Sequence, residues 1–384
     1  MMTKKFTIVH AAAVLATATL ASNPALAAEY WLRAAVTTVN MPNPAGGAAI
    51  AVPMWGYASC TGATASTCAV PTVPGPALTV PAGDVELKIH LLNDLSTPTS
   101  IVINGLIKPM TPVWNDGATG NRTTLMQRVR SFDAEAAPAG SMTYTWPNVK
   151  PGTYLYQSGT QPQVQVQMGL YGAVNKNAVE ADPLATTPVR AQSYAGAAYA
   201  YDNQATLLYS EIDPALHEAV ATGAYGTSAG PTSTFSYAPK YFLINGQPYP
   251  TNAVIAPIGS PGTTLLRLLN AGLTTHVPMI QGTHWKVVAE DGKPYPYSSN
   301  QYTALLPAAK TLDVMLNSQA DIGGGTSYAI MDRRMSLSNN GVSDGGMLAY
   351  LSYGAQGVSG PDGLTDSNQA PIPVADGYNS VKGV

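Results

Sequence analysis

The segment Gly152-Thr-Tyr-Leu-Tyr-Gln-Ser-Gly159, followed by Met168-Gly-Leu-Tyr-Gly-Ala173, is informative because its pattern occurs twice in the chain. A third strand-like segment, Gly140-Ser-Met-Thr-Tyr-Thr-Trp146, precedes it. Three comparable segments follow in the same order and at similar spacing in the second half of the chain: Lys310–Leu316, Gly325–Ile330 and Gly345–Leu351. A repeat of this kind predicts two related β-sandwiches in tandem.

Alternation of apolar and polar residues marks individual strands within each half. Residues 84–93 place four apolar side chains on one face of a strand: Val85, Leu87, Ile89 and Leu91. Residues 163–167 alternate Gln and Val in the same way, which predicts another strand. Many short strands separated by Gly and Pro turns are typical of a sandwich, so the fold class predicted here is all-β.

Composition and length agree with an all-β protein of two domains. Charged residues make up 11% of the 384 residues, against roughly 25% in ordinary soluble domains. The length suits two domains of about 150 to 170 residues each. The net charge is -3 and no basic run is present, so the sequence predicts neither nucleic acid nor an anionic membrane surface as a partner.

The first residues have the three-part layout of a secretory signal peptide. Lys4 and Lys5 precede an apolar run over residues 6–20, and Ala25-Leu26-Ala27 supplies the small residues of a cleavage site. Cleavage after Ala27 or Ala28 is expected. No later segment approaches the ~20 apolar residues that a membrane span requires. We therefore predict a secreted, periplasmic or cell-surface protein with no membrane span.

The repeated segments resemble the multicopper oxidase family, whose first cupredoxin domain ends in Gly-Thr-Tyr-Trp-Tyr-His-Ser-His and then Gly-Leu-Tyr-Gly. Other segments resemble family motifs in the family's order: Val73-Pro-Gly-Pro76, Thr99-Ser-Ile-Val-Ile-Asn-Gly105, Trp114-Asn-Asp-Gly117, Phe242-Leu-Ile-Asn-Gly246, Leu266-Arg-Leu-Leu-Asn-Ala-Gly272, Gly282-Thr-His284, Ala289-Glu-Asp-Gly292 and Ala309-Lys-Thr-Leu-Asp-Val314. The resemblance covers most of residues 73–351 and implies two tandem cupredoxin-like Greek-key β-sandwiches.

This resemblance, together with composition, divides the chain into five parts. They are a signal peptide (1–28), a first cupredoxin-like domain (29–175), a connector with one short helix (176–236), a second cupredoxin-like domain (237–354) and a flexible tail or linker (355–384). The helix is expected over residues 213–219, where Pro214 follows Asp213 as at a helix N-terminus.

The copper chemistry of the family is not matched by the residues. Proteins of this family coordinate their trinuclear copper cluster with His-X-His pairs. Alternate residues of a strand project to the same side, so both histidines of a pair can reach the metals. Here Val102 and Asn104 stand at the first pair, and Gln157 and Gly159 at the second. These four positions are therefore interpreted as degenerate copper-ligand positions. Copper is implied by family resemblance only, and no cofactor is expected in this chain.

The two cysteines, Cys60 and Cys68, lie in one loop of small residues. Since the chain is predicted to be exported, we expect them to form an intrachain disulfide. A metal-thiolate site is disfavoured because no His or further Cys is near them in sequence. Neither cysteine has the downstream His and Met of a type 1 copper centre.

Four histidines remain outside the predicted signal peptide. His276 and His284, with Met279 between them, are the candidates for a weak metal site with a nearby acidic residue. The competing interpretation, which follows from the family resemblance, gives the histidine at the Gly-X-His position, His284, a structural hydrogen-bonding role inside the sandwich. His90 and His217 are expected to be solvated at the surface.

Two further catalytic motifs, a phosphate-binding loop and His-Glu-X-X-His, are absent from the sequence. Asp116, Asp133 and Glu135 are interpreted as solvated loop carboxylates rather than as a catalytic pair. No catalytic residue is predicted.

Two function classes are left open. One is a non-catalytic binding or structural role towards an unknown surface or extracytoplasmic protein partner. The other is the N-terminal part of a longer copper-dependent oxidoreductase, whose copper centre lies in a domain downstream of this chain.

Overall fold

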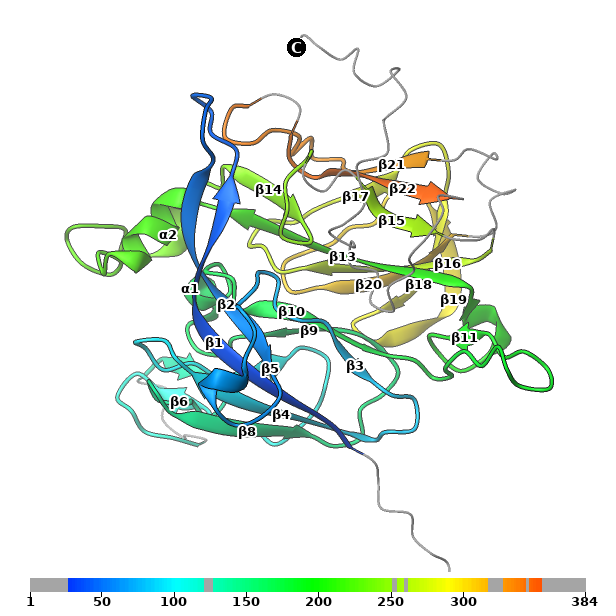
Figure 1. Cartoon of the computed structure of the whole chain (residues 1–384), viewed down its shortest axis with the longest axis horizontal. Helices are drawn as coiled ribbons and strands as arrows, with labels where there is room; N and C mark the ends of the chain where they lie inside the picture. Colours follow the sequence, from blue (N-terminus) through cyan, green and yellow to red (C-terminus); the bar gives the residue numbers. More distant parts are fainter. Residues whose placement is uncertain are drawn as a thin grey trace, which may run out of the picture.

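The structure is a computed structural model that describes residues 27–120, 127–250, 254–258, 262–316, 327–342 and 345–353. Strands dominate it, and they form two β-sandwiches, one above the other in Figure 1. The prediction of an all-β tandem sandwich is confirmed. The predicted signal peptide and tail lie almost wholly outside the described residues, and the predicted domain boundaries stay predictions.

The first sandwich consists of two four-stranded sheets. One has the order β2 (Ile50–Cys60), β1 (Ala27–Met41), β4 (Glu86–Asn93), β8 (Ser141–Trp146). The other has the order β3 (Leu78–Val80), β10 (Tyr171–Lys176), β9 (Gly152–Gln157), β5 (Val102–Ile103). A separate pair, β6 (Val113–Trp114) and β7 (Val129–Ser131), lies in the loops of this half.

The second sandwich consists of a six-stranded and a four-stranded sheet. The larger has the order β14 (Tyr241–Ile244), β13 (Asn203–Ile212), β16 (Thr264–Asn270), β20 (Thr311–Leu316), β18 (Trp285–Glu290), β19 (Lys293–Gln301). The smaller has the order β15 (Val254–Ile258), β22 (Leu348–Tyr353), β21 (Ser327–Asp332), β17 (Pro278–Ile280). The connector adds the pair β11 (Ala191–Gln192) and β12 (Ala200–Tyr201).

The two sandwiches have the same topology. In each, a parallel pair is followed by an antiparallel partner: β1, β4 and β8 in the first, and β13, β16 and β20 in the second. The opposite sheets also correspond, with β3, β10, β9 and β5 in the places of β15, β22, β21 and β17. This correspondence accounts for the sequence repeat, because β8, β9 and β10 carry the first set of segments and β20, β21 and β22 the second.

The alternation predicted for residues 84–93 is found in β4. Leu87, Ile89 and Leu91 are fully buried in the core between the two sheets of the first sandwich. Val85 is 43% exposed instead, because it precedes the first residue of the strand. Burying each of these large apolar side chains contributes about 1.5 to 3 kcal/mol.

An apolar cluster joins the sandwiches. It combines residues of the β1–β2 hairpin and of β9 and β10 with residues of β13, β14 and β16: Met41, Met54, Leu155, Tyr171, Leu208, Ile212, Tyr241, Leu243 and Leu269 among them. The hairpin, dark blue in Figure 1, runs from the first sandwich to the second beside α2 (Pro214–Ala221). The sandwiches are therefore packed into one body through a shared core.

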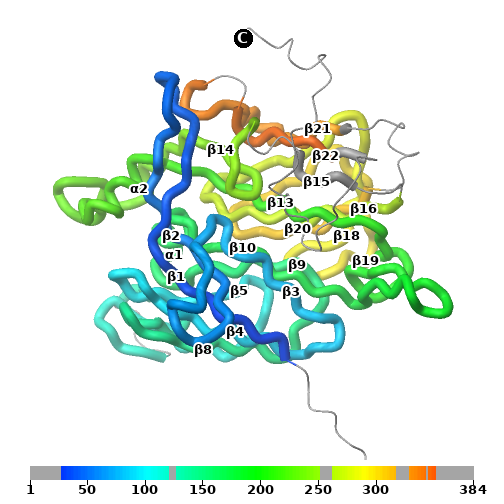
Figure 2. The backbone as a smooth tube through the Cα atoms, viewed as in Figure 1, coloured from blue at the N-terminus to red at the C-terminus, as the bar shows by residue number. Residues whose placement is uncertain are grey.

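A buried polar network reinforces this junction where β9 packs against β16 and β20, as the tube in Figure 2 shows. Arg267 on β16 is 1% exposed, and its Nη1 donates to Thr153 Oγ1 of β9 at 2.7 Å. Asp313, opposite Arg267 in the β16–β20 ladder, accepts from Thr153 Oγ1 and from the Tyr194 hydroxyl, both at 2.5 Å. The buried charges thus have hydrogen-bonding partners from both sandwiches.

Helices are few and short. The predicted helix after Asp213 is confirmed as α2, where the Asp213 carboxylate accepts from the amide of Ala215 at 3.0 Å and Pro214 is the first residue. The strand predicted over residues 163–167 is wrong. That segment begins with α1 (Pro162–Gln165), because Pro162 has the fixed φ suited to a helix start. Short 3-10 turns cover Ala65–Thr67, Ala197–Tyr199 and Thr234–Ser236.

Within the described residues, no helix is long and apolar enough to cross a membrane.

Candidate functional site

The four positions singled out in the sequence lie along one edge of the first sandwich, called here the β5–β9 corner: Val102, Asn104, Gln157 and Gly159. Val102 and Gln157 are directly paired across β5 and β9. Because these strands are antiparallel, Asn104 and Gly159 lie on opposite sides of that pair, beside Leu155 and Ser100 respectively. Strand β5 is the last strand of its sheet, which places the corner at a sheet edge.

Apolar packing occupies the centre of this corner. A Cβ atom at Gly159 would lie 2.6 Å from Cγ1 of Val102 and 2.9 Å from the Ser100 hydroxyl. Real Cβ contacts are essentially never that short. Val102 is itself only 6% exposed. The valine side chain therefore fills the space that any side chain at position 159 would need.

A neutral hydrogen-bond network lies directly behind the corner. Gln165 Oε1 accepts from Thr99 Oγ1 at 2.7 Å and from Ser158 Oγ at 2.6 Å, and its Nε2 donates to the carbonyl of Pro98 at 2.9 Å. The other buried hydroxyls of the network belong to Ser100, Ser131 and Thr160. Helix α1 ends at Gln165 and so places this side chain in the network.

His276 lies in the second sandwich and is fully buried between two carboxylates. Its Nδ1 is 2.9 Å from Asp332 Oδ2 and its Nε2 is 3.2 Å from Glu211 Oε1. Asp332 Oδ1 also accepts from the amides of Val277 and Arg334, at 2.8 and 3.1 Å. Burial opposes protonation, but the hydrogen bonds that the ring donates to both carboxylates outweigh it and raise the pKa of His276.

The pKa of Asp332 is shifted in the complementary direction. Burial alone would raise it, yet the bond from His276 and the two backbone amides hold the pKa of this carboxyl below its usual range. Both shifts favour an imidazolium at His276 facing a carboxylate at Asp332. Both ring nitrogens of His276 lie within hydrogen-bond distance of a carboxylate oxygen.

His284 does not join this group. It is exposed, and its ring lies 5.6 Å from the ring of Tyr302 in an edge-on arrangement. The structural role inside the sandwich that was expected for His284 is therefore wrong, because the residue precedes β18 at the surface. In the part of the chain that the structure describes, no group of three or more His, Cys, Asp or Glu side chains is placed to hold a metal ion. A weak metal site at His276 and His284 stays a prediction that the geometry does not favour.

The expectation of a solvated His217 is wrong. This residue is 0% exposed because α2 packs against β2, and its Nδ1 is 2.9 Å from the carbonyl of Pro53. Burial lowers the pKa of His217 to about 4, against the opposing effect of the Pro53 bond. His90, in contrast, is partly exposed, stacks on Trp31 and is 2.6 Å from Glu29 Oε1.

Two of the three loop carboxylates are not solvated either, contrary to the prediction. Asp133 is 2% exposed, pairs with Lys108 and accepts from two backbone amides. Glu135 forms a bidentate pair with Arg130, at 3.2 and 2.6 Å. Asp116 is exposed, as predicted. These pairs hold loops of the first sandwich in place.

The disulfide between Cys60 and Cys68 is present in the structure, as predicted. The two residues also form a backbone bridge that closes the loop after β2. The disulfide therefore holds this loop closed.

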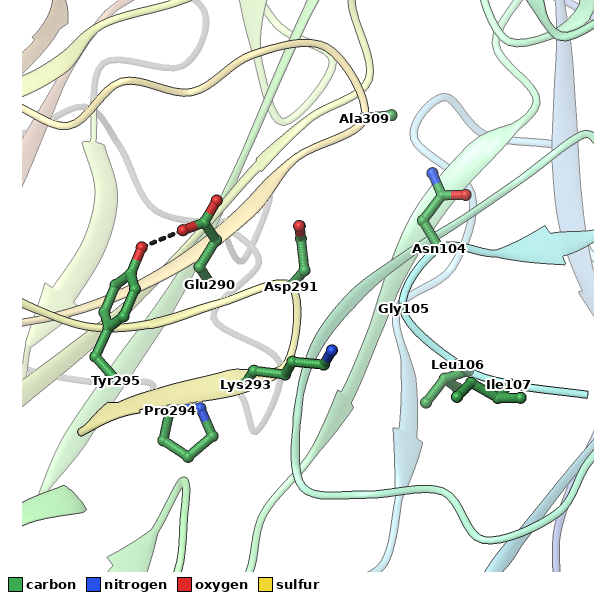
Figure 3. Close-up of a pocket in the computed structure, with 10 residues that line it drawn as sticks. All are labelled: Asn104, Gly105, Leu106, Ile107, Glu290, Asp291, Lys293, Pro294, Tyr295 and Ala309. Atoms are coloured by element: carbon green, nitrogen blue, oxygen red, sulfur yellow. Dashed lines mark hydrogen bonds between the residues drawn. The ribbon is translucent and has the colours of Figure 1, made fainter.

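A cleft lies beside the β5–β9 corner, between the two sandwiches (Figure 3). Its volume is about 570 Å³, and Asn104 belongs to both the corner and the cleft. The first sandwich contributes Asn104 to Ile107, and the second contributes the β18–β19 turn with Glu290, Asp291, Lys293 and Tyr295. The sequence resemblance drew attention to Asn104 and to the facing turn Ala289-Glu-Asp-Gly292, but not to Lys293 or Tyr295.

Residues 55–179 match the protein family described as multicopper oxidase. The matched residues make up most of the first sandwich, which is therefore similar to a multicopper oxidase domain. Solved multicopper oxidase structures match both sandwiches. A blue copper oxidase from Nitrosomonas europaea has a TM-score of 0.60 and 18% identity, covering 85% of this chain and 86% of that one. The multicopper oxidase mgLAC has a TM-score of 0.60 and 18% identity, covering 87% and 88%.

A third match differs in extent. Fet3p, a multicopper oxidase that functions in iron import, has a TM-score of 0.57 and 18% identity, covering 92% of this chain but 56% of that one. At such identities the likeness establishes the fold, two tandem cupredoxin-like sandwiches. No curated protein matches the chain.

The first sandwich does not present the donors that the copper cluster of this family needs at the β5–β9 corner. Val102 has no donor atom, Gly159 has no side chain, and Asn104 and Gln157 offer neutral amides in place of imidazole. Copper in proteins is held by imidazole, thiolate and thioether groups. The residues present therefore do not fit a copper cluster.

Proposed function

We propose that this chain is an exported, non-catalytic cupredoxin protein with a binding or structural role towards a partner at the cell surface. The partner is an extracytoplasmic protein or surface component. In this proposal the multicopper oxidase scaffold is kept for its stability and its surface, and no copper cofactor is bound.

The observation that carries the proposal is the packing of Val102 against Gly159. Loss of a single histidine leaves a vacant ligand position, but here the volume of one ligand side chain is filled by another residue. The neutral network of Gln165 then satisfies the buried hydroxyls of Thr99, Ser158 and Thr160. A histidine at position 159 would have to displace Val102 and disturb this network.

Export is supported by two independent features. The sequence of residues 1–28 has the layout of a signal peptide. The described part of the chain contains a disulfide, which persists in oxidising compartments.

The alternative function is the N-terminal part of a longer copper-dependent oxidoreductase. The match to Fet3p favours it, because nearly all of this chain corresponds to only 56% of that protein. In this case the copper centre would lie in a domain beyond the two sandwiches.

Oxygen uptake with phenolic substrates tests the proposal. The purified chain is incubated with copper, desalted and supplied with phenols, with a copper-loaded blue copper oxidase as the positive control. We expect no oxygen consumption above the protein-free rate. Turnover that a copper chelator abolishes would overturn the non-catalytic proposal and leave the oxidoreductase alternative.

A further inference from the structure

The cleft between the sandwiches has walls that are fixed by close backbone packing. The ring of Tyr154 lies under the β18–β19 turn, where a Cβ at Gly292 would be 2.2 Å from its Cε1 atom. A Cβ at Gly105 would lie 3.1 Å from the carbonyl oxygen of Asp291 in the opposite wall. Glycines at both places allow this approach. The cleft is therefore formed before any ligand arrives, as is usual for small-molecule sites.

Its acidic groups are partly neutralised by a neighbouring lysine. The Lys310 ammonium pairs with the carboxylates of both Glu290 and Asp291, the latter at 2.8 Å. Glu290 also accepts from the Tyr295 hydroxyl, as Figure 3 shows. The hydrogen bonds from Lys310 and Tyr295 lower the pKa of Glu290, so it stays a carboxylate. Together with Lys293, this part of the molecule has two negative formal charges, on Glu290 and Asp291, and two positive ones, on Lys293 and Lys310.

Two polar side chains of the lining have no partner among the residues that the structure describes. Among the described residues, neither the Lys293 ammonium nor the Asn104 side-chain amide makes a hydrogen bond or ion pair. In Figure 3 the Lys293 side chain extends between Asp291 and Leu106, with Asn104 on the facing wall. Apolar surface lies next to these donors, and Ile107 is 89% exposed.

We propose that this cleft binds a neutral saccharide. The proposal rests on the binding role proposed above and names its ligand. Sugar hydroxyls both donate and accept, so they suit a lining in which carboxylates, an amide and an ammonium alternate. The balanced charges give no net attraction to an anion or a cation. Leu106, Ile107 and Pro294 offer apolar contact to the C–H face of a sugar ring.

Saturation-transfer NMR with methyl glycosides tests this ligand class. The probes are the methyl glycosides of glucose, galactose and mannose, and the glucuronide and glucosaminide that carry one negative or one positive charge on the same ring. We expect at least one neutral glycoside to bind with a dissociation constant on the order of 1 mM. We expect the charged analogues to bind more weakly than their neutral parent.

Matched variants locate the binding. Asn104→Ala and Lys293→Ala should each weaken binding by about fivefold, as expected for loss of one hydrogen-bonding group. Lys286→Ala, on β18 but outside the cleft, should leave it unchanged. Binding of none of the neutral glycosides, preference for the glucuronide, or binding insensitive to Asn104→Ala and Lys293→Ala would each overturn the proposal. Because none of these outcomes involves copper or oxygen uptake, they leave the test of the non-catalytic role separate.

Discussion

Asn93 in the first sandwich and Asn270 in the second make the same hydrogen bonds at the same place in the fold. Each amide nitrogen donates to the carbonyl four residues later, at 2.9 Å to Thr97 and 2.8 Å to Thr274. Each also donates to the carbonyl of a segment distant in sequence, at 2.9 Å to Ala136 and at 2.9 Å to Leu306. The backbone turn that follows this asparagine is thus stabilised in the same way in both sandwiches.

The buried side chains that follow these two turns differ in chemistry. Thr99 forms the backbone bridge with Ala136, and His276 forms the equivalent bridge with Leu306. The Thr99 hydroxyl enters a neutral network, whereas His276 is held between the carboxylates of Glu211 and Asp332. One fold therefore accepts neutral or charged interior chemistry once its backbone groups are satisfied. The same tolerance explains how copper-ligand positions of the scaffold can hold packed apolar residues.

The buried group of His276, Glu211 and Asp332, called here the charged corner, should show the largest loss of stability on mutation. Asp332→Ala leaves the His276 imidazolium and two backbone amides without their partner, so we expect a loss of about 3 to 5 kcal/mol in the free energy of unfolding. Urea denaturation measures it. Asp94→Ala, an exposed carboxylate paired with Arg33, is the control and should cost less than about 1 kcal/mol. Equal effects of the two substitutions would contradict the account of the charged corner.

The two buried histidines should give opposite pH dependences. His217 has its pKa lowered to about 4, so the unfolded chain takes up a proton first and stability falls as pH drops from about 6.5 towards 4, by up to about 3 kcal/mol. His276 has a raised pKa, so its contribution is complete below the unfolded value near 6.5 and is lost as pH rises through the folded value.

Stability curves measured against pH separate these contributions. His217→Leu should flatten the acid side of the curve, and His276→Gln should flatten the alkaline side. An unchanged alkaline side in His276→Gln would show that His276 is not held as an imidazolium.

The turns held by Asn93 and Asn270 should contribute equally to the free energy of unfolding. Asn93→Ala and Asn270→Ala each remove three hydrogen bonds, including one accepted from the amide of Leu95 or Gly272. We expect each to cost about 2 to 3 kcal/mol. Asn115→Ala, at an exposed turn position, serves as the control. A large difference between Asn93→Ala and Asn270→Ala would break the comparison between the sandwiches.

The packing at the β5–β9 corner should give the smallest effect. Gly159→Ala forces Val102 to move, at a cost of about 1 to 3 kcal/mol. In the Val102→Ala background the same substitution should cost much less, because the methyl groups that it meets are absent. Thermal unfolding of the four proteins in this cycle measures the coupling. Strictly additive effects would mean that Val102 and Gly159 do not share the space.

Much of the fold could be predicted from sequence because its signals are local. Alternation in β4 and the repeated segments of β8 to β10 and β20 to β22 depend on residues close together in the chain. The four positions of the β5–β9 corner could also be found from sequence, because the motifs that resemble the family occur in the family's order and β-strand periodicity pairs the residues within each motif.

Other features depend on contacts distant in sequence. The alternating Gln and Val of 163–167 indicated a strand, but Pro162 and the burial of Gln165 make it a helix. Polarity indicated a solvated His217, yet the β1–β2 hairpin covers it. Lys293 carries no local sign of a binding site, because the cleft exists only where two sandwiches meet. The turn residues of Ala289-Glu-Asp-Gly292 were the one signal that pointed to that place.

The copper content of the purified chain tests the central claim, that packed side chains have replaced the copper site. The chain is incubated with excess copper, desalted and measured by elemental analysis, with the blue copper oxidase treated in parallel. The account predicts no tightly held copper and no intense blue absorption from a copper-thiolate bond. Two or more coppers retained per chain would contradict it.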